Sequence, residues 1–554
     1  MSTVLPYPRG VPRSISYPEI PLHALLENSA RKYPNRDAIV FYGRKLTYAG
    51  LWDSTRHFAS ALRGLGIEGG DRVGLLMPNV PQFVIAYYAT LVAGGVVVAV
   101  SSLNPADEIR RQLGETGVKV LVALDRFLDK AMQTGSKLVV ARAETYLPLH
   151  LRLPSHLKGV RDHPDGIEFE RLLKSPPAMD AVEIDPRHDL AAIQYTEGTT
   201  GHPKGVMLTH FNLVSNALQT FHWLRGWGFS AKPQLAGRPI VVCAIPFFHI
   251  YGMTVGLNEP VHFGSTLVLV PDPKPEPIMR AIHGHRATHL PAIPAMIRGI
   301  VEHPRRSDYD LTSLTDCVSG GAPLDPEVAK MFVQMTGARL FQGYGLTEAG
   351  PVTHCTPVDG DPLPQSVGLP FPDTEAKVVD VQLGEVEVPP GQEGELIIRG
   401  PQVMSGYWND AEATASALRN GWLYTGDIAR LDERGLLHIV GRKQERIVSS
   451  GHVVWPSRVE EVLRTHPAVE AAAALGVPDP LRCATDVRAV VTLRAGWDLD
   501  ETRRSLTELC AKHLEPYQVP SEITIVRSLP TTPLGKIDKR ALVQGFAERS
   551  GDLA

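Results

Sequence analysis

The sequence predicts an α/β protein in which a large N-terminal domain precedes a small one. Strand-like and helical segments alternate from about residue 37, a pattern typical of mostly parallel sheets flanked by helices. The chain has 554 residues, too many for one ordinary domain. The charged segment LDERGLLHIVGRKQER, with Gly435 and Gly441, marks a change in composition. We therefore expect one domain over residues 1–441 and a second, α+β domain over residues 442–554.

The elements of the first domain are predicted from the spacing of their apolar residues. Short apolar runs favour strands, and apolar residues that recur every three or four positions favour helices. Pro81 suits the first turn of a helix, because the N–H that it lacks would have no partner there. The expected strands are Asp37–Tyr42, Arg72–Met77, Val96–Val100 and Val118–Ala123, and the expected helices are Leu51–Leu65 and Pro81–Val92.

The second domain is predicted to contain two helices and a strand. Ser457 stands three residues before Glu460, the spacing of a capping box, and Pro467 closes the helix that this box would begin. Apolar residues then alternate as in a half-buried strand, at Val487, Ala489, Val491 and Leu493. One face of a last helix is predicted at Leu506, Leu509, Cys510, His513 and Leu514.

Composition and charge exclude several classes of function. The formal net charge of -4 gives no electrostatic reason to expect a nucleic acid partner. No run of eighteen apolar residues is present, which argues against a membrane span. The first twenty residues hold four prolines and no apolar core, so they do not resemble a secretory signal. The five cysteines are scattered, as expected for reduced thiols in the cytoplasm.

A segment rich in Thr and Gly, QYTEGTTGHPKGVMLTH, follows a strand-like stretch at residues 190–195. Small residues let backbone N–H groups approach phosphate oxygens, and Lys204 supplies positive charge. The segment does not fit the Walker pattern, since Lys204 is followed by Gly205. We predict a phosphate-binding loop whose ligands are Thr196, Gly198, Thr199, Thr200, Gly201 and Lys204.

This loop resembles the signature of the adenylate-forming superfamily, which includes acyl- and aryl-CoA synthetases, firefly luciferase and peptide-synthetase adenylation domains. Glu197 departs from the usual Ser, Gly or Thr. The segments SGGAPL and QGYGLTEAG resemble further motifs of the family, in the family's order. The resemblance implies that Tyr344 stacks on adenine, Thr347 bonds phosphate, and Glu348 holds Mg²⁺ with Thr199. The other implied nucleotide contacts are Gly320, Gly321, Ala322, Gln342, Gly343 and Gly345.

Motifs nearer the C-terminus extend the resemblance. In GWLYTGD and HIVGRKQER, Asp427 and Arg442 resemble the pair that holds the ribose. PTTPLGKIDKR resembles the C-terminal motif, so Lys536 is implied to be the mobile lysine that bridges the substrate carboxylate and the α-phosphate. The same resemblance implies a small domain that swings, with Gln444 at the hinge. The segment PFFHIYG contains no Asp that could pair with the ammonium group of an amino-acid substrate. Its His249 is expected to line an acyl pocket or to pack in the core.

The segments from His249 to Leu437, among them GPQVMSGYWN, are similar to bacterial long-chain fatty acyl-CoA synthetases. The resemblance implies that ATP, Mg²⁺ and coenzyme A are used to convert a medium- to long-chain fatty acid to its acyl-adenylate, with release of pyrophosphate, and then to a thioester. An aryl acid, a carrier-protein thiol as acceptor, and an inactive nucleotide-binding protein remain as alternatives. Peripheral membrane contact for a lipid substrate and a homodimer are left open.

Overall fold

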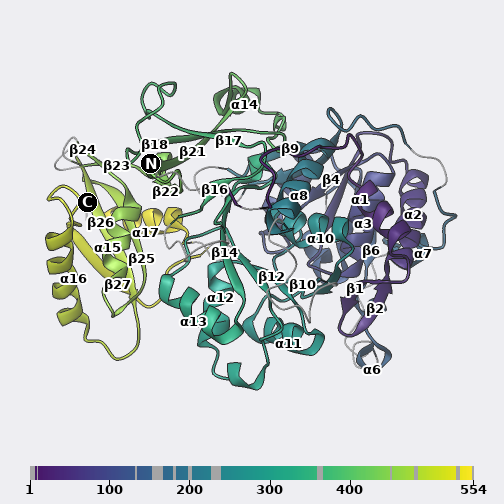
Figure 1. Ribbon diagram of the computed structural model, residues 1–554, viewed down its shortest axis with the longest axis horizontal. Coiled ribbons are helices and arrows are strands. Elements are labelled where there is room, and N and C mark those ends of the chain that lie inside the picture. The colour runs from purple at the N-terminus through teal and green to yellow at the C-terminus, as the bar shows by residue number, and fades with distance from the viewer. Residues whose placement is uncertain are drawn as a thin grey trace.

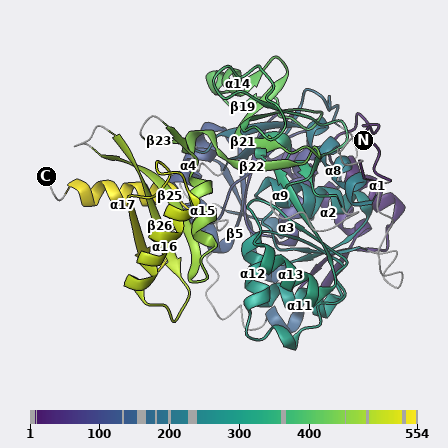
Figure 2. The same ribbon diagram turned by 60° about the vertical axis from the view of Figure 1, so that its left-hand side comes forward.

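The computed structural model describes residues 7–8, 10–131, 134–152, 166–178, 182–196, 202–225, 239–357, 366–449, 452–479, 484–531 and 537–551. Three sheets with their helices form the larger part of the molecule, and the elements after β22 (Leu437–Arg442) form a smaller unit at one end (Figures 1 and 2). The α/β class is confirmed. The boundary predicted after residue 441 falls inside β22, whose last residue still pairs with Asp427, and it stays a prediction.

The first sheet has eight strands. The six that lie from β8 to the far edge at β7 run parallel to one another. Two antiparallel strands, β9 and β19, extend it on the side of the predicted phosphate loop. In spatial order the strands are β19 (Gly406–Tyr407), β9 (Gly205–Thr209), β8 (Leu190–Tyr195), β4 (Val96–Ala99), β3 (Arg72–Leu76), β5 (Val120–Leu124), β6 (Lys137–Ala141) and β7 (Ile167–Glu168).

The second sheet has nine strands, with a parallel centre and antiparallel strands at both edges. Chain segments far apart in sequence meet in it, since β1 pairs with β11. In spatial order its strands are β16 (Leu369–Pro370), β15 (Val352–Cys355), β14 (Arg339–Gly345), β13 (Asp316–Ser319), β12 (His289–Ala292), β10 (Ile240–Cys243), β11 (Thr266–Leu269), β1 (Asp37–Phe41) and β2 (Arg44–Thr47).

A third sheet is antiparallel throughout, which the expectation of mostly parallel sheets did not include. It consists of β17 (Glu375–Val379), β18 (Gly394–Arg399), β21 (Trp422–Leu431), β20 (Leu418–Arg419) and β22. Short turns join β20 to β21 and β21 to β22, whereas β19 and α14 (Ala411–Ala417) lie between β18 and β20; an antiparallel pair needs no crossover helix.

Helix α3 (Pro81–Val92) packs between the two large sheets. It is apolar on nearly all sides and residues 81–91 are buried, as expected for a helix without a solvent face. The hydroxyls of Tyr87 and Tyr88 lie 3.0 Å from the side-chain amide of Asn258, in the π-helical turn η4 (Thr254–Asn258). These bonds satisfy the polar atoms that the core would otherwise leave unpaired.

The remaining helices cover the sheets and connect their strands. They are α1 (Ala24–Lys32), α2 (Tyr48–Gly64), α4 (Ala106–Glu115), α5 (Leu128–Ala131), α6 (Leu149–Arg152), α7 (Phe169–Leu172), α8 (His210–Arg225), α9 (Ile250–Met253), α10 (Glu259–Phe263), α11 (Pro275–His285), α12 (Pro294–Glu302), α13 (Pro326–Thr336) and α14 (Ala411–Ala417), with 3-10 turns η1 (Asp125–Phe127), η2 (Ala143–Tyr146), η5 (Arg306–Asp308), η6 (Thr347–Ala349) and η7 (Lys443–Glu445).

The smaller unit holds a hairpin, a three-stranded sheet and three helices. Its core lies between the sheet and the helices α15 and α16. A second small cluster, with Leu542 of α17, covers the other side of β26. The elements are β23 (Ile447–Ser449), β24 (His452–Val454), α15 (Pro456–Arg464), β25 (Val469–Asp479), β26 (Ala484–Leu493), α16 (Leu499–His513), β27 (Glu522–Val526) and α17 (Lys539–Gly551).

Three expectations for this unit were wrong. Trp455, not Ser457, is the N-cap of α15, and the Ser457 hydroxyl donates to the Val440 carbonyl. His513 is exposed, and α17 follows α16. The alternating residues of β26 do face the core of this unit, but the strand is covered on both faces rather than half-buried, because Val490 and Leu542 belong to a cluster on its other side. Within the described ranges, no helix is long and apolar enough to cross a membrane.

Candidate active site

The predicted phosphate loop leaves β8 and returns along β9, and two hydrogen bonds join Thr196 and Lys204 at its ends. Thr196 N donates to the Lys204 carbonyl at 3.0 Å, and Lys204 N donates to the Thr196 hydroxyl at 3.0 Å. Both residues are therefore where the sequence placed them, at the base of the loop. Gly198, Thr199, Thr200 and Gly201, together with Glu197, lie outside the described residues.

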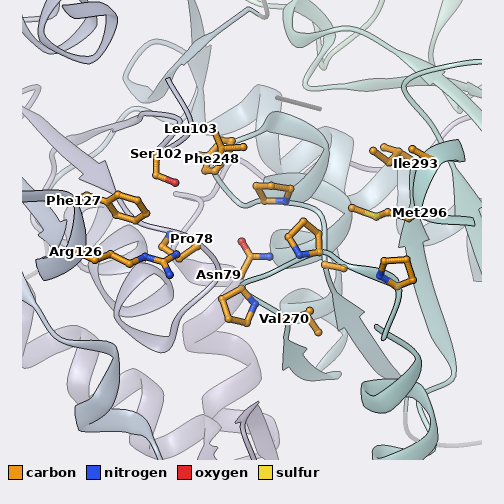
Figure 3. Close-up of a pocket in the computed structure, with 16 residues that line it drawn as sticks. Pro78, Asn79, Ser102, Leu103, Arg126, Phe127, Phe248, Val270, Ile293 and Met296 are labelled. Carbon is orange, nitrogen blue, oxygen red and sulfur yellow. The ribbon is translucent and has the colours of Figure 1, made fainter. Parts of the chain in front are cut away.

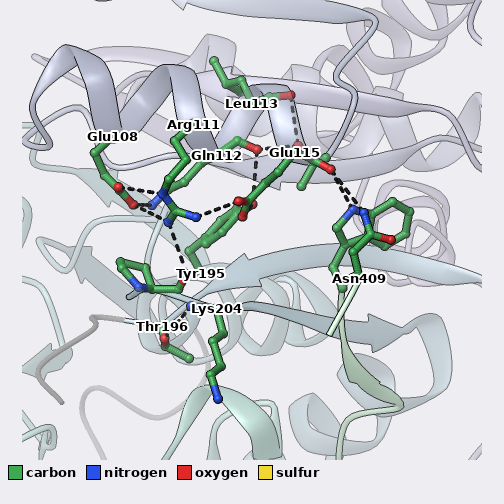
Figure 4. A network of polar contacts seen from close by, with 12 residues as sticks. Glu108, Arg111, Gln112, Leu113, Glu115, Tyr195, Thr196, Lys204 and Asn409 are labelled. Carbon is green, nitrogen blue, oxygen red and sulfur yellow. Dashed lines mark hydrogen bonds and ion pairs between the residues drawn. The ribbon is translucent and has the colours of Figure 1, made fainter. Parts of the chain in front are cut away.

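Helix α4 holds this base from one side (Figure 4). Arg111 forms ion pairs with Glu108 at 2.7 Å and Glu115 at 2.6 Å, and donates to the Pro203 carbonyl at 3.2 Å. The Tyr195 hydroxyl donates to Glu115. The hydrogen bond to Glu108 is the largest cause that raises the pKa of Arg111. The network holds the backbone at Pro203, while the Lys204 side chain points away from α4.

Tyr407, on the short strand β19, contacts two of the predicted catalytic groups. Its hydroxyl donates to Glu348 Oε1 at 2.7 Å, and the Lys204 ammonium lies 4.9 Å from the centre of its ring. Burial and the Glu348 carboxylate raise the pKa of Tyr407, so the phenol stays a donor. Glu348 and Thr347 form the turn η6 after β14, and the structure thus brings two sheets together at this point.

Asp427 and Arg442, which are predicted to hold the ribose, form an ion pair with each other. Asp427 on β21 is buried, and its Oδ1 lies 2.8 Å from Arg442 Nε on the neighbouring strand β22. Its Oδ2 accepts a hydrogen bond from the Tyr344 hydroxyl at 2.5 Å. Asp427 raises the pKa of Arg442, and burial followed by Asp427 raises that of Tyr344. Tyr344, the predicted adenine contact, is therefore bonded to the Asp427–Arg442 ion pair.

In the two predicted adenine motifs, one glycine allows two backbone segments to lie close together, and another allows a left-handed backbone conformation. A Cβ at Gly345 would lie 2.1 Å from the Pro351 carbonyl oxygen, so no larger residue fits. Gly321 has a φ of +85°, in the left-handed region that favours glycine. Gly320 and Ala322 flank it in the same turn after β13, while Gln342 and Gly343 lie on β14.

His249 is the N-cap of α9, where its Nδ1 accepts a hydrogen bond from Tyr251 N at 3.1 Å. It is half-buried, and it is absent from the residues that line the cavity described below.

Gln444, the predicted hinge residue, is exposed in η7 between two anchored neighbours. Lys443 pairs with the buried Glu395 at 2.5 Å, and Glu445 pairs with Lys539 at 2.6 Å. Lys536 lies outside the described residues.

A cavity of about 520 Å³ lies where the carboxyl ends of strands from both large sheets meet (Figure 3). Its wall is mostly apolar, and Arg126 stands at one side. The wall adjoins the nucleotide motifs at two points: the Phe248 carbonyl accepts from Gln194 at 2.5 Å, and a Cβ at Gly321 would lie 3.8 Å from Ile293. The lining residues are Pro78, Asn79, Ser102, Leu103, Arg126, Phe127, Ala244, Pro246, Phe248, Val270, Pro271, Pro273, Pro275, Ile293, Ala295 and Met296.

Sequence reasoning missed three contributors to this site. Tyr407 stands in GPQVMSGYWN, a segment quoted for its resemblance without a role for the tyrosine. Arg111 could have been found, because Glu108 and Glu115 precede and follow it at helical spacings of three and four. The pairing of Lys443 with Glu395 had no local signal, since 48 residues separate the two.

The chain matches known proteins over nearly its full length. Residues 26–408 match the family described as AMP-binding enzyme, and residues 458–536 match the AMP-binding enzyme C-terminal domain. A long-chain-fatty-acid–CoA ligase of Bacillus subtilis (strain 168) is 37% identical, over 98% of this chain and 97% of that protein. A feruloyl-CoA synthase of an Amycolatopsis species is 33% identical, over 93% of this chain and 97% of that protein.

Solved structures agree with this assignment. The crystal structure of ATP-bound MatB from Rhodopseudomonas palustris superposes with a TM-score of 0.82 at 27% identity, covering 95% of this chain and 99% of that one. The match covers both units of the molecule, and two of the motifs predicted to bind the nucleotide follow β8 and span the end of β14. The chain therefore belongs to the family of AMP-binding enzymes.

Proposed function

We propose that the protein is an ATP-dependent acid–thiol ligase that joins a medium- to long-chain fatty acid to coenzyme A. The observation that carries the proposal is the meeting of Lys204 and Glu348 at Tyr407. An ammonium from one sheet and a carboxylate from the other lie against the same side chain, which supports their proposed roles toward a triphosphate and its metal. The full-length similarity to the Bacillus subtilis ligase supports the choice of a fatty acid.

In the first step, a carboxylate oxygen of the fatty acid attacks the α-phosphorus of ATP, and pyrophosphate leaves. Negative charge on the phosphate oxygens rises during this attack, so positioned cations lower the barrier. Lys204 supplies one such charge, and we assign a second to Lys536. Asp427 is placed to accept hydrogen bonds from the ribose hydroxyls, with Arg442 beside it.

The Glu348 carboxylate has the chemistry expected of an Mg²⁺ ligand. The described residues contain no cluster of three or more His, Cys, Asp or Glu side chains that could hold a metal. Mg²⁺ bound with a nucleotide commonly uses one or two carboxylates and completes its shell with phosphate oxygens and water, so a single carboxylate is adequate. When bound, the ion would supply charge neutralisation at the phosphates. Thr199, the second predicted ligand, lies outside the described residues.

In the second step, the thiol of coenzyme A attacks the acyl carbonyl, and AMP leaves. We assign the apolar cavity to the long uncharged arm that carries this thiol. Its wall adjoins the nucleotide motifs, and the exposed guanidinium of Arg126 offers a partner to the phosphates at the other end of the molecule. A fatty acyl chain has no second charge and would gain nothing from Arg126.

Met296→Trp distinguishes the two occupants of the cavity. Met296 lines the cavity from α12, and the larger indole would reduce its volume. We expect pyrophosphate exchange with palmitate to stay within about twofold, while the rate of thioester formation falls at least about tenfold. Loss of exchange with palmitate but not with hexanoate would instead place the acyl chain in the cavity.

An aryl acid is the second candidate substrate, because the Amycolatopsis feruloyl-CoA synthase is 33% identical. The decisive experiment is pyrophosphate release with Mg²⁺-ATP and a panel of hexanoate, decanoate, palmitate, oleate, cinnamate and ferulate. Thioester formation is then measured by mass spectrometry with coenzyme A or an acyl carrier protein as acceptor. We expect the fatty acids and coenzyme A to give the highest kcat/KM. We also propose that the enzyme is cytoplasmic. Absence of AMP formation with every acid would refute the proposal.

A further inference from the structure

Tyr407 occupies a position that the predicted chemistry leaves without a role. It belongs to β19, which pairs antiparallel with β9, so that Tyr407 stands opposite Val206. Lys204 lies immediately before β9. The tyrosine is therefore tied through the backbone to the strand that leaves the phosphate loop, while its hydroxyl reaches Glu348 on the other sheet.

The segment that carries Tyr407 is anchored on both sides. Trp408 N donates to the Gly205 carbonyl at 2.7 Å. The Trp408 indole N–H donates to the Glu115 carbonyl at 3.0 Å, at the end of α4. Glu115 in turn pairs with Arg111, which holds Pro203. Tyr407 therefore has little freedom to follow Lys204 or Glu348, and these side chains are positioned against it.

The hydroxyl and the ring of Tyr407 each interact favourably with one charged side chain, Glu348 and Lys204 respectively. The phenol hydroxyl donates to a carboxylate, a hydrogen bond that is stronger than one between neutral groups. The face of the ring attracts an ammonium. Within the described part of the chain, no ion pair joins Lys204 to Glu348, although both contact the same side chain. If these charges paired with each other, neither would be available to the metal or to the phosphates.

We propose that Tyr407 is a positioning residue that orients Glu348 toward the metal and Lys204 toward the phosphates and keeps the two from pairing. The inference rests on the proposed roles of Glu348 and Lys204. It predicts that loss of the Tyr407 hydroxyl weakens binding of Mg²⁺-ATP, and that loss of the ring also weakens binding of ATP without Mg²⁺. A residue that only stabilised the fold would affect both equally, through the stability of the protein.

The test compares Tyr407→Phe, which removes only the hydroxyl, with Tyr407→Leu, which removes the ring as well. Binding of ATP to the full chain is measured by calorimetry with and without Mg²⁺, alongside thermal unfolding and pyrophosphate exchange. The control is Tyr17→Phe, which removes another half-buried tyrosine hydroxyl bonded to a carboxylate, Asp373, at 2.8 Å.

We expect Tyr407→Phe to weaken binding of Mg²⁺-ATP about tenfold, the size of one charge-assisted hydrogen bond, with Mg²⁺-free ATP within about twofold of wild type. Tyr407→Leu should in addition weaken Mg²⁺-free ATP by about threefold. The melting temperature of Tyr407→Phe should match that of Tyr17→Phe. Equal affinities in wild type, Tyr407→Phe and Tyr407→Leu would overturn the inference, as would equal losses with and without Mg²⁺.

A double-mutant cycle separates this inference from the proposed metal site. If Glu348→Gln leaves the Mg²⁺ dependence of ATP binding unchanged, the role of Glu348 itself is wrong. If Glu348→Gln raises the Mg²⁺ requirement and Tyr407→Phe does not, only the inference about Tyr407 fails. If Tyr407 acts through Glu348, the two substitutions together should be no worse than Glu348→Gln alone.

Discussion

Lys539 joins three parts of the smaller unit, and its replacement by methionine should loosen them. Its ammonium lies 2.6 Å from Glu445 in η7 and 2.9 Å from Glu460 in α15, while Lys539 itself begins α17. Burial lowers the pKa of Lys539, but Glu460 and Glu445 outweigh burial and raise it. Methionine keeps much of the apolar length and leaves two carboxylates close together without their cation.

The size of the effect follows from the exposure of the three side chains. They are 21% exposed for Lys539, 27% for Glu445 and 11% for Glu460. Breaking a fully buried pair costs about 3–5 kcal/mol, and we expect about 2–3 kcal/mol at this partly exposed site. For a unit of about a hundred residues, that corresponds to a decrease of about 10 °C in melting temperature.

The assay is thermal and urea unfolding, with hydrogen exchange of the α17 amides to locate the loss. The control is Lys45→Met, which breaks a pair of similar length, 2.7 Å to Asp37, whose side chains are 63% and 32% exposed. An exposed pair contributes about 0–1 kcal/mol, so the control should change little. Equal effects of the two substitutions, or unchanged exchange in α17, would refute the reasoning.

The sign of the pH dependence follows from the raised pKa of Lys539. Since the folded-state pKa is above the unfolded value, the stabilisation is complete below the unfolded pKa of lysine and is lost as pH rises through the folded value. The difference in stability between wild type and Lys539→Met should therefore shrink as pH rises through the folded-state pKa of Lys539.

Three further substitutions test the assigned roles. Lys536→Ala should slow pyrophosphate exchange at least about a hundredfold, because one charge at a phosphoryl-transfer centre is worth about 3 kcal/mol, and should barely slow thioester formation from supplied acyl-adenylate; equal damage to both steps would contradict its role. Asp427→Asn should weaken ATP binding by calorimetry about tenfold, since Arg442 and the ribose lose a charged acceptor, and an unchanged affinity would remove Asp427 from the site. Gln444→Pro fixes φ at the proposed hinge; exchange should stay within about tenfold while coenzyme A-dependent turnover falls far more, and a parallel fall of both rates in a folded protein would place the hinge elsewhere.

The sequence alone determined the family, the α/β class and the positions of the nucleotide motifs. Lys204, Glu348 and Asp427 could be named because each stands in a short motif, and a motif is a local property of the chain. In the structure Lys204 directly precedes β9, Glu348 lies in η6 after β14, and Asp427 lies within β21, where it pairs with Arg442. Helix α3 was also predictable, since its bounds follow from Pro81 and an apolar run.

Only the tertiary structure decided which distant side chains share a contact. Ser457 and Glu460 have capping-box spacing, yet Ser457 donates to the Val440 carbonyl, and Glu460 accepts from Ala474 N at 3.0 Å. Local spacing cannot predict that partners from β22 and β25 will take these side chains. Glu348 and Tyr407 are likewise 59 residues apart in sequence. Their contact exists because the two large sheets, each stable through its own strand pairing, bring η6 and β19 together, and no pattern within either segment encodes that distance.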